Sequence, residues 1–323
     1  MFRVYSRILL GKYISRPDPF AVTKRIPPLA RTKANPVTII PLDRMSNLPN
    51  RELSIFIRDS ASIESLRAIG LPGLLDLLTA RSPFLTAREL YRITVGLSRL
   101  DVIHNTGLLP LLSRCILDER KNSFLAHEIA HICVELAACT RRLDETKNRD
   151  TLLPLLSGLA DEFGRKIEAA SPSDLSHITS ALVDVGISDP DLFASISQYA
   201  TIQMGMFTGP ELADLLLGFA VSGLKSDRLI RAAAPQLITR MPLLIDVQLL
   251  QLGFTACRFI DQIGDSFIDR YVAVLEDPKR SFSDVPRDVW IDFASSVERL
   301  GIEQRLPRTA AIMRRTVGDT GLV

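Results

Sequence analysis

Apolar residues recur with helical spacing in two consecutive stretches of 37 residues, 171–207 and 208–244. Each stretch opens with a hydroxyl residue followed three places later by an acidic residue, which is the spacing of a helix-capping box. A glycine, Gly186 or Gly223, stands where the amphipathic helix would end. The dipeptide Ser-Asp, a second start signal, follows shortly after each glycine. The pattern predicts a helix–turn–helix unit that is repeated.

The same frame extends over most of the chain when one apolar residue of each first helix is taken as its anchor. The predicted anchors are Leu53, Leu90, Ile129, Leu175, Leu212, Leu249 and Trp290. An acidic or amide residue precedes most anchors, and a small residue usually stands six places after them, where it lets helices cross closely. We therefore predict an all-α fold, an α-solenoid of about seven helix–turn–helix repeats of 37–46 residues, over residues 50–323. The anchors expected to be buried between repeats are Leu90, Leu175, Leu212 and Leu249.

The first 35 residues differ in composition from the rest, with eight basic side chains and one acidic side chain, Asp18. Such a basic, amphipathic leader is typical of a mitochondrial presequence and predicts location in the mitochondrial matrix. A basic tail that touches nucleic acid is the alternative. Several prolines then predict an extended linker over 36–49, and a charged insertion, 141–150, predicts an exposed loop within the third repeat.

Charge changes the picture of the repeats themselves. The chain has 39 basic and 37 acidic residues, so removing the leader leaves 31 and 36, a net charge of −5. Strong non-specific binding of nucleic acid usually needs a basic surface, which favours a protein-binding role for the body. The longest uncharged run, 192–210, is too polar to predict a membrane span.

The four cysteines form no CxxC pair, and Cys133 and Cys139 lie at apolar-stripe or helix-interior positions, which predicts buried free thiols in a reducing compartment. They are Cys115, Cys133, Cys139 and Cys257.

The segment His127-Glu128-Ile129-Ala130-His131 matches the HExxH motif of zinc peptidases, in which two histidines bind one metal and the glutamate acts as general base. Three observations oppose that interpretation. Glu128 occupies the acidic position that precedes other anchors, His131 occupies a position that is polar in other repeats, and no third ligand stands at a recognisable spacing; Glu162 is a conceivable distant one. We predict no catalytic residue, metal or cofactor, and keep a zinc metallopeptidase as an alternative. Phosphate-loop, dinucleotide-binding and serine-elbow motifs are absent from the sequence.

The repeat length, the anchor after an acidic residue and the phrase Leu182-Val-Asp-Val-Gly186 followed by Asp189 carry a family resemblance. They resemble the heptatricopeptide and octotricopeptide repeats of organellar RNA-binding proteins, including the FAST-kinase-like and RAP group. The resemblance covers about residues 50–316 and implies an α-solenoid that binds organellar RNA without catalysis, in processing, stability, editing or translation. The last repeat takes up the chain from Trp290 onwards, so no RAP-like domain is expected after it.

A binding surface is predicted where residues two and nine places after the anchors project from one side of the first helices. These residues are Arg92, Arg99, His131, His177, Gln251, Arg258 and Arg299. Arginines can stack on bases or bind phosphate, while the histidines and the glutamine can contact base edges, so the predicted partner is single-stranded mitochondrial RNA. An ordinary solvated helix face is one alternative. A scaffold that binds only protein subunits of a mitochondrial ribonucleoprotein is the other.

Overall fold

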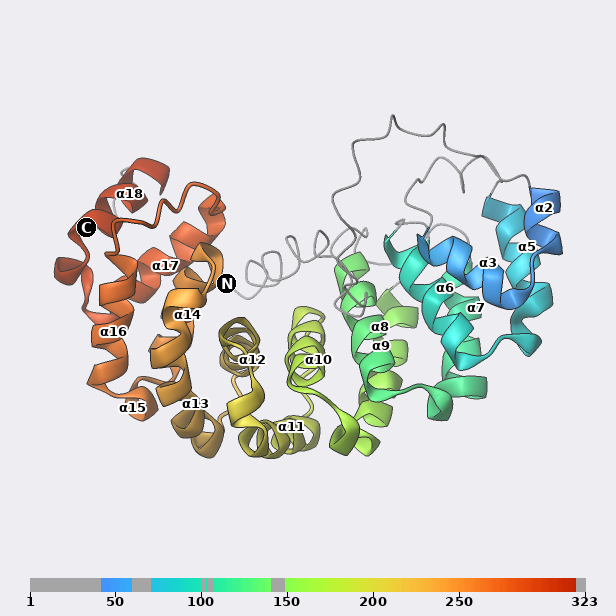
Figure 1. The fold of residues 1–323 in the computed structure, drawn as a ribbon, viewed down its shortest axis with the longest axis horizontal. Helices are drawn as coiled ribbons and strands as arrows, with labels where there is room; N and C mark the ends of the chain where they lie inside the picture. Colours follow the sequence, from blue (N-terminus) through green and yellow to red (C-terminus); the bar gives the residue numbers. More distant parts are fainter. Residues whose placement is uncertain (1–41, 60–70, 100–102, 104–106, 141–148, 318–323) are drawn as a thin grey trace, which may run out of the picture. The chain divides into compact units, whose positions relative to one another are not determined.

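The computed structural model describes residues 42–59, 71–99, 103, 107–140 and 149–317 (Figure 1). These described residues form helices and turns and contain no β-strand, so the predicted all-α class is confirmed. The chain folds as two compact units, which we call the N-terminal unit, up to Arg165, and the C-terminal unit, from Lys166. The predicted presequence, 1–35, lies outside the described residues.

The N-terminal unit contains three helices that pack side by side, α3 on α6 and α6 on α8. A second layer includes α7, which packs on α9. The helices are α2 (Leu42–Asn47), α3 (Asn50–Asp59), α5 (Leu71–Arg81), α6 (Ala87–Arg99), α7 (Leu108–Arg114), α8 (Ala126–Thr140) and α9 (Arg149–Arg165). Short connections are the 3-10 turns η2 (Ser82–Phe84) and η4 (Lys121–Ser123) and the π-helix η3 (Cys115–Arg120).

The C-terminal unit repeats this arrangement with α10, α12, α14 and α17 in one row and α11, α13 and α16 in another (Figure 1). Its helices are α10 (Pro172–Asp184), α11 (Pro190–Ile202), α12 (Gly209–Ser222), α13 (Asp227–Arg240), α14 (Asp246–Arg258), α15 (Ile260–Ile263), α16 (Asp265–Leu275), α17 (Arg287–Leu300) and α18 (Pro307–Val317). Its 3-10 turns are η5 (Ile167–Ala169), η6 (Met204–Met206), η7 (Met241–Leu243) and η8 (Glu303–Arg305).

Helix boundaries follow from local sequence in both units. Ser171 and Asp174 form a capping box at the start of α10, in which the Ser171 N–H donates to the carboxylate at 2.9 Å. Thr208 and Glu211 do the same for α12, at 2.8 Å. Gly223 ends α12 with φ of +75°, a left-handed conformation that glycine adopts without strain.

The anchor residues form the core of each unit. Leu53, Leu90, Ile129, Leu175, Leu212 and Leu249 have no exposed side-chain surface, and Trp290 is 1% exposed. The predicted burial is therefore confirmed. Burying these side chains removes apolar surface from water and adds dispersion contacts, which together are the main favourable contribution to the free energy of folding.

Two glycines six places after an anchor let first helices approach closely. A Cβ at Gly96 would lie 2.5 Å from the main-chain oxygen of Ile57 on α3. A Cβ at Gly218 would lie 2.5 Å from Cγ2 of Thr179 on α10. Only a residue without a side chain fits these crossings as they stand.

Three regions differ from the expected pattern or lie beyond it. The predicted linker, 36–49, is not extended throughout, because 42–47 forms α2 with Met45 fully buried. The predicted loop, 141–150, lies mostly outside the described residues, and its last two residues begin α9. The second half of the sixth repeat is split into α15 and α16. No helix in the described ranges is long and apolar enough to cross a membrane.

Side chains from one helix pair bind main-chain carbonyls of the turn before it. Arg120 donates from Nε to the Leu85 oxygen at 3.1 Å, and Gln203 donates to the Ala170 oxygen at 3.0 Å. Arg240 donates to the Gly205 oxygen at 3.2 Å. We call each such contact an inter-repeat clamp, and its remaining donors are Arg81, Arg280 and Arg308. Donors and acceptors are separated by about one repeat length, so the clamps tie successive helix pairs together.

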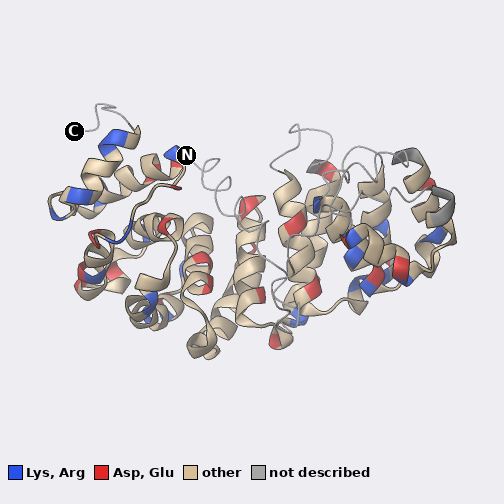
Figure 2. Ribbon diagram, turned by 45° about the horizontal axis from the view of Figure 1, so that its top comes forward, with Lys and Arg blue, Asp and Glu red and all other residues tan. Residues whose placement is uncertain are grey.

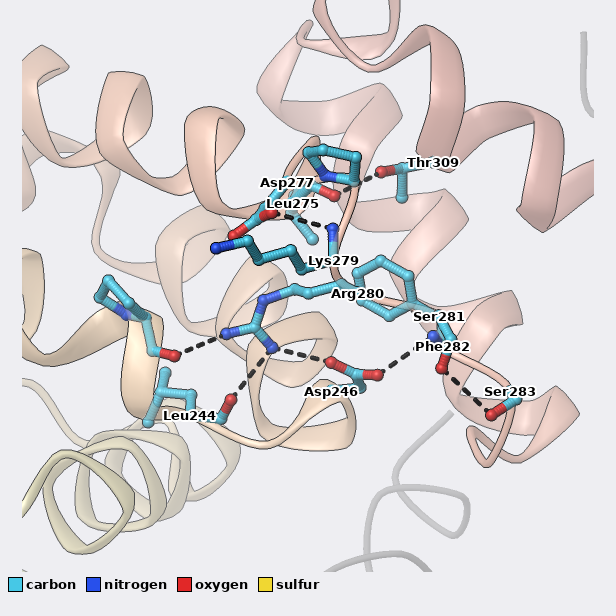
Figure 3. A network of polar contacts seen from close by, with 12 residues as sticks. Leu244, Asp246, Leu275, Asp277, Lys279, Arg280, Ser281, Phe282, Ser283 and Thr309 are labelled. Atoms are coloured by element: carbon cyan, nitrogen blue, oxygen red, sulfur yellow. Dashed lines mark hydrogen bonds and ion pairs between the residues drawn. The ribbon is translucent and has the colours of Figure 1, made fainter.

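Figure 3 shows the clamp at Arg280. Its guanidinium donates to the carbonyl oxygens of Pro242 and Leu244, at 2.9 and 3.1 Å. It also forms an ion pair with Asp246 at 2.7 Å. The second carboxylate oxygen of Asp246 accepts a hydrogen bond from the N–H of Phe282 at 3.1 Å. One carboxylate therefore joins the start of α14 to the connection between α16 and α17.

Candidate nucleic-acid interface

The first helix of each repeat has one side on which polar residues recur. The positions on this side stand two places before the anchor and two, five and nine places after it. Their spacings alternate between four and three residues, so the side chains lie in line along the helix. We call this line of positions the polar stripe. On α3, α6 and α8 of the N-terminal unit it carries basic side chains and no acidic one. These side chains are Arg51, Arg58, Arg88, Arg92, Arg99, His127 and His131.

Four of these arginines gather where α3 packs on α6, and we call Arg51, Arg58, Arg88 and Arg92 the arginine group. Burial lowers the pKa of Arg92, and the charges of Arg88, Arg58 and Arg51 lower it further, while Glu89 acts in the opposite direction. The charges of Arg88, Arg58 and Arg51 therefore all lie near Arg92. Figure 2 shows basic segments on these helices.

The arginine group has little compensation by carboxylates. Arg58 forms an ion pair with its neighbour Asp59 at 2.7 Å. Within the described ranges, Arg51, Arg88 and Arg92 make no ion pair. Arg51 and Arg88 are exposed and Arg92 is half-buried. Concentrated positive charge without internal partners attracts anions, and a guanidinium matches phosphate with two parallel hydrogen bonds.

A second cluster lies between α6 and α8. Arg99 donates to Glu135 at 2.7 Å and contacts Nε2 of His131 at 3.1 Å, while the Tyr91 hydroxyl meets Nδ1 of His131 at 2.7 Å. Burial raises the pKa of Glu135, but the hydrogen bond to His131 and the charge of Arg99 outweigh it and leave this pKa lowered. Glu135 therefore neutralises part of Arg99, and Arg92 has the less compensated charge.

The other predicted residues lie in the C-terminal unit. His177 is half-buried, with Nδ1 3.5 Å from the Ser173 hydroxyl. Gln251 is 6% exposed, so its side chain is largely withdrawn from the surface. Arg258 and Arg299 are exposed, and the guanidinium of Arg258 lies over the Phe254 ring with 5.5 Å to the centroid.

The polar stripe changes sign between the two units. In the C-terminal unit it carries Asp184, Asp214, Asp288 and Asp292 beside its two arginines. Asp214 is buried and accepts a hydrogen bond from Gln248 at 2.9 Å. The basic surface suited to a polyanion is therefore on the N-terminal unit, where Arg92, Arg99 and His131 lie.

Sequence reasoning missed three members of the arginine group, Arg51, Arg58 and Arg88. The predicted surface contains only positions two and nine places after an anchor. Arg51, Arg58 and Arg88 stand one helical turn before or after the position that is two places beyond the anchor. The helical spacing of the whole stripe is the sequence signal that includes them.

The residues of the HExxH segment have other partners. A carboxylate oxygen of Glu128 accepts the Leu125 N–H at 3.0 Å, which caps α8 as expected, and Glu128 is 5% exposed. His131 belongs to the cluster with Tyr91 and Glu135. Glu162 accepts a hydrogen bond from Arg165 at 3.0 Å. Within the described residues no group of three potential metal ligands occurs.

The cysteines are free thiols in the structure, three of them buried and Cys257 half-buried. Burial raises the pKa of the Cys133 thiol, which keeps it protonated and unreactive. Cys139 and Cys257 each donate to a main-chain carbonyl of a neighbouring first helix, at Ser98 and Ser296. Their part in the structure is packing.

Fold and stripe together define the class of this protein: an all-α chain of packed helix pairs with a basic surface on its N-terminal unit. No model of a known protein family matches the sequence, and a comparison with curated proteins found no match.

Proposed function

We propose that this chain is a non-catalytic α-solenoid of the mitochondrial matrix that binds single-stranded RNA through its N-terminal unit. It acts within a mitochondrial ribonucleoprotein, in RNA processing, editing or translation. The basic leader, 1–35, supports the location, and the resemblance to organellar helical-repeat proteins supports the process.

The arginine group is the observation that carries the RNA-binding proposal. Three arginines without ion-pair partners stand next to a fourth on two packed helices, so their charge is available to phosphates. Tyr91 and His131 lie on the same layer of helices and add ring systems that bases can stack on. This combination of cations and rings is typical of sites that follow a single strand.

The solenoid part of the proposal is supported within each unit. First helices pack on first helices and second helices on second helices. Inter-repeat clamps recur in both units at the same place in the helix pair. A repeat that contacts its sequence neighbours in the same way each time is the defining property of a solenoid.

A matched pair of variants tests where RNA binds. Arg88→Ala/Arg92→Ala removes two arginines from the stripe of the N-terminal unit, and Arg258→Ala/Arg299→Ala removes two from that of the C-terminal unit. Binding of a labelled oligouridine is measured by fluorescence anisotropy at several salt concentrations. We expect the first variant to bind more weakly and to lower the salt slope by about two, near one per lost phosphate contact, with little change in the second.

Equal binding by the parent and Arg88→Ala/Arg92→Ala would show that the arginine group is not the site. Circular dichroism of both variants controls for folding. A parent protein that binds no oligouridine would reject the RNA-binding proposal altogether.

A protein-binding scaffold is the second candidate, and exposed apolar residues in the turns favour it. Phe84, Met206 and Leu243, each six places before an anchor, are 74, 71 and 72% exposed. Large apolar side chains repeated at one place in successive turns are suited to protein contacts. This candidate also agrees with the net charge of −5 of residues 36–323.

A further inference from the structure

The arginine group surrounds one guanidinium, that of Arg92. Gly96 lets α3 approach α6 so closely that a Cβ at this glycine would lie 2.8 Å from the Cα of Arg58. Arg92 stands one helical turn before Gly96, on the side of α6 that faces α3. Burial and the charges of Arg88, Arg58 and Arg51 lower the pKa of Arg92. The four cations are thus concentrated at one helix crossing instead of being spread along a helix.

Two of these arginines do not stabilise the helices that carry them. Arg51 and Arg88 are each the second residue of their helix, α3 and α6, where the helix dipole disfavours a cation. Glu89, whose charge raises the pKa of Arg92, also caps α6 by accepting the Thr86 N–H at 2.8 Å. Like charges gathered in this way repel one another, and an anion bound between them removes that cost.

The number and placement of the arginines favour a terminal phosphate over a phosphate within a strand. A phosphodiester carries one negative charge and has two free oxygens, and the next phosphate lies a nucleotide away. A phosphomonoester carries about 1.5 to 2 negative charges at pH 7 and has three acceptor oxygens. Because a guanidinium binds two phosphate oxygens in parallel, several arginines gathered at one crossing are better satisfied by the monoester.

Rings lie next to the arginine group, on the side of α6 that faces α8. Tyr91, which precedes Arg92 in the sequence, meets His131 of α8 with 5.6 Å between the ring centroids. Such rings offer a surface on which a base can stack. A terminal nucleotide needs a site for its phosphate and a surface for its base, and α6 has these two features on neighbouring sides.

We propose that the arginine group binds the terminal phosphate of an RNA strand and that the first base stacks on the rings of Tyr91 and His131. Such a site rests on the proposed RNA-binding function and narrows its ligand from any single strand to a strand end. Hydrolysis of a phosphodiester leaves a phosphate on one of the two new ends. The preferred RNA is therefore a product of cleavage.

The test measures binding of the full chain to three oligouridines of equal length, labelled at an internal base, by fluorescence anisotropy. One has a 5′-phosphate, one has a 3′-phosphate and one has hydroxyl groups at both ends. We expect one phosphorylated strand to bind about tenfold more tightly than the hydroxyl strand, as for a few added charge-assisted hydrogen bonds. Equal affinities for all three would overturn the terminal-phosphate site and leave RNA binding intact. A chain that binds none of them would contradict RNA binding itself.

Two substitutions locate the site. Arg92→Gln removes the central guanidinium, and Arg88→Gln removes an exposed one that takes no part in the core. We expect each to reduce the preference for the phosphorylated strand to about twofold. Arg114→Gln changes an exposed arginine of α7, in the second layer of the same unit, and should keep the tenfold preference of the parent as the control. A preference that survives in both Arg92→Gln and Arg88→Gln would overturn the proposal.

The pH dependence identifies the bound group. A phosphomonoester loses its second proton at about pH 6, so the ratio of the affinities for the phosphorylated and hydroxyl strands should rise from about pH 5 to about pH 7.5. Taking this ratio cancels any titration of His127 or His131 that affects both strands alike. A constant ratio would overturn the proposal. So would a phosphoserine peptide that competes as well as the phosphorylated strand, since the site would then serve a phosphorylated protein.

Discussion

Arg280 shows how one side chain can hold two helix pairs together. Its side chain is 13% exposed, and it binds two carbonyl oxygens of the preceding connection as well as Asp246. Removing one member of such a network leaves the others buried and unpaired, which costs more than the network's net contribution. The same reasoning applies to Arg81 and Arg308, whose guanidinium groups also make three hydrogen bonds each.

Arg280→Met keeps the length of the side chain and removes its donors. We expect it to lower the free energy of unfolding by about 2–3 kcal/mol, measured by urea denaturation. Arg305→Met is the matched control, because its ion pair with Asp269 has side chains that are 45 and 65% exposed. An exposed pair contributes at most about 1 kcal/mol. Equal losses in the two variants would mean that the clamp is not a stabilising contact.

Asp292 should make stability depend on pH. Burial raises its pKa from the 3.8 of an ordinary aspartate to about 6 when folded, so between these values the folded chain binds the extra proton. The stabilisation by this proton is complete below about pH 3.8 and is lost as pH rises through about 6. Asp292→Asn should therefore raise the melting temperature at neutral pH and have little effect near pH 4. A variant less stable than the parent at neutral pH would contradict the assigned environment.

At the scale of helices, the crossings at Gly96 and Gly218 have different neighbours. At Gly96 an added methyl group would meet the main chain of α3, which cannot move without shifting the helix. At Gly218 it would meet the methyl group of Thr179, a single side chain. Both substitutions gain helix propensity, which offsets part of the cost.

We expect Gly96→Ala to lower the free energy of unfolding by about 1–3 kcal/mol, the usual cost of overpacking, and Gly218→Ala to lower it less. Adding Thr179→Ser to Gly218→Ala removes the clashing methyl group and should recover most of the loss. Urea denaturation of the three variants measures this. If the added substitution restores nothing, the α10–α12 crossing is not limited by Thr179.

Much of the helical pattern could be predicted, because it depends on local signals. Capping residues such as Ser171 and Thr208 satisfy N–H groups within a few residues, and anchors repeat with the helical period. The π-helix at Cys115–Arg120 carries no comparable signal, whereas the break between α15 and α16 falls at Gly264, a local signal that the predicted repeat did not use. The clamps were also missed, since each depends on two residues about 35 positions apart.

At the scale of the molecule, the predicted binding surface was assigned residues from both units, Arg92, Arg99 and His131 in one and His177, Gln251, Arg258 and Arg299 in the other. The structure instead separates a basic stripe on the N-terminal unit from an acidic one on the C-terminal unit. Arg92 is half-buried, with its guanidinium among other arginines, while Gln251 is withdrawn between α14 and α17. Position within a repeat predicts which way a residue points, but the tightness of the helix crossing decides whether it remains accessible.

The clamps also bear on how the chain matures during synthesis. The Leu244 oxygen receives its donor from Arg280, which leaves the ribosome 36 residues later. A nascent helix pair therefore exposes unpaired carbonyls until most of the next pair has been translated. Folding should advance one pair behind elongation, from the N-terminus onwards. Fragments ending just after a clamp arginine should consequently resist proteolysis better than fragments that stop a few residues before it.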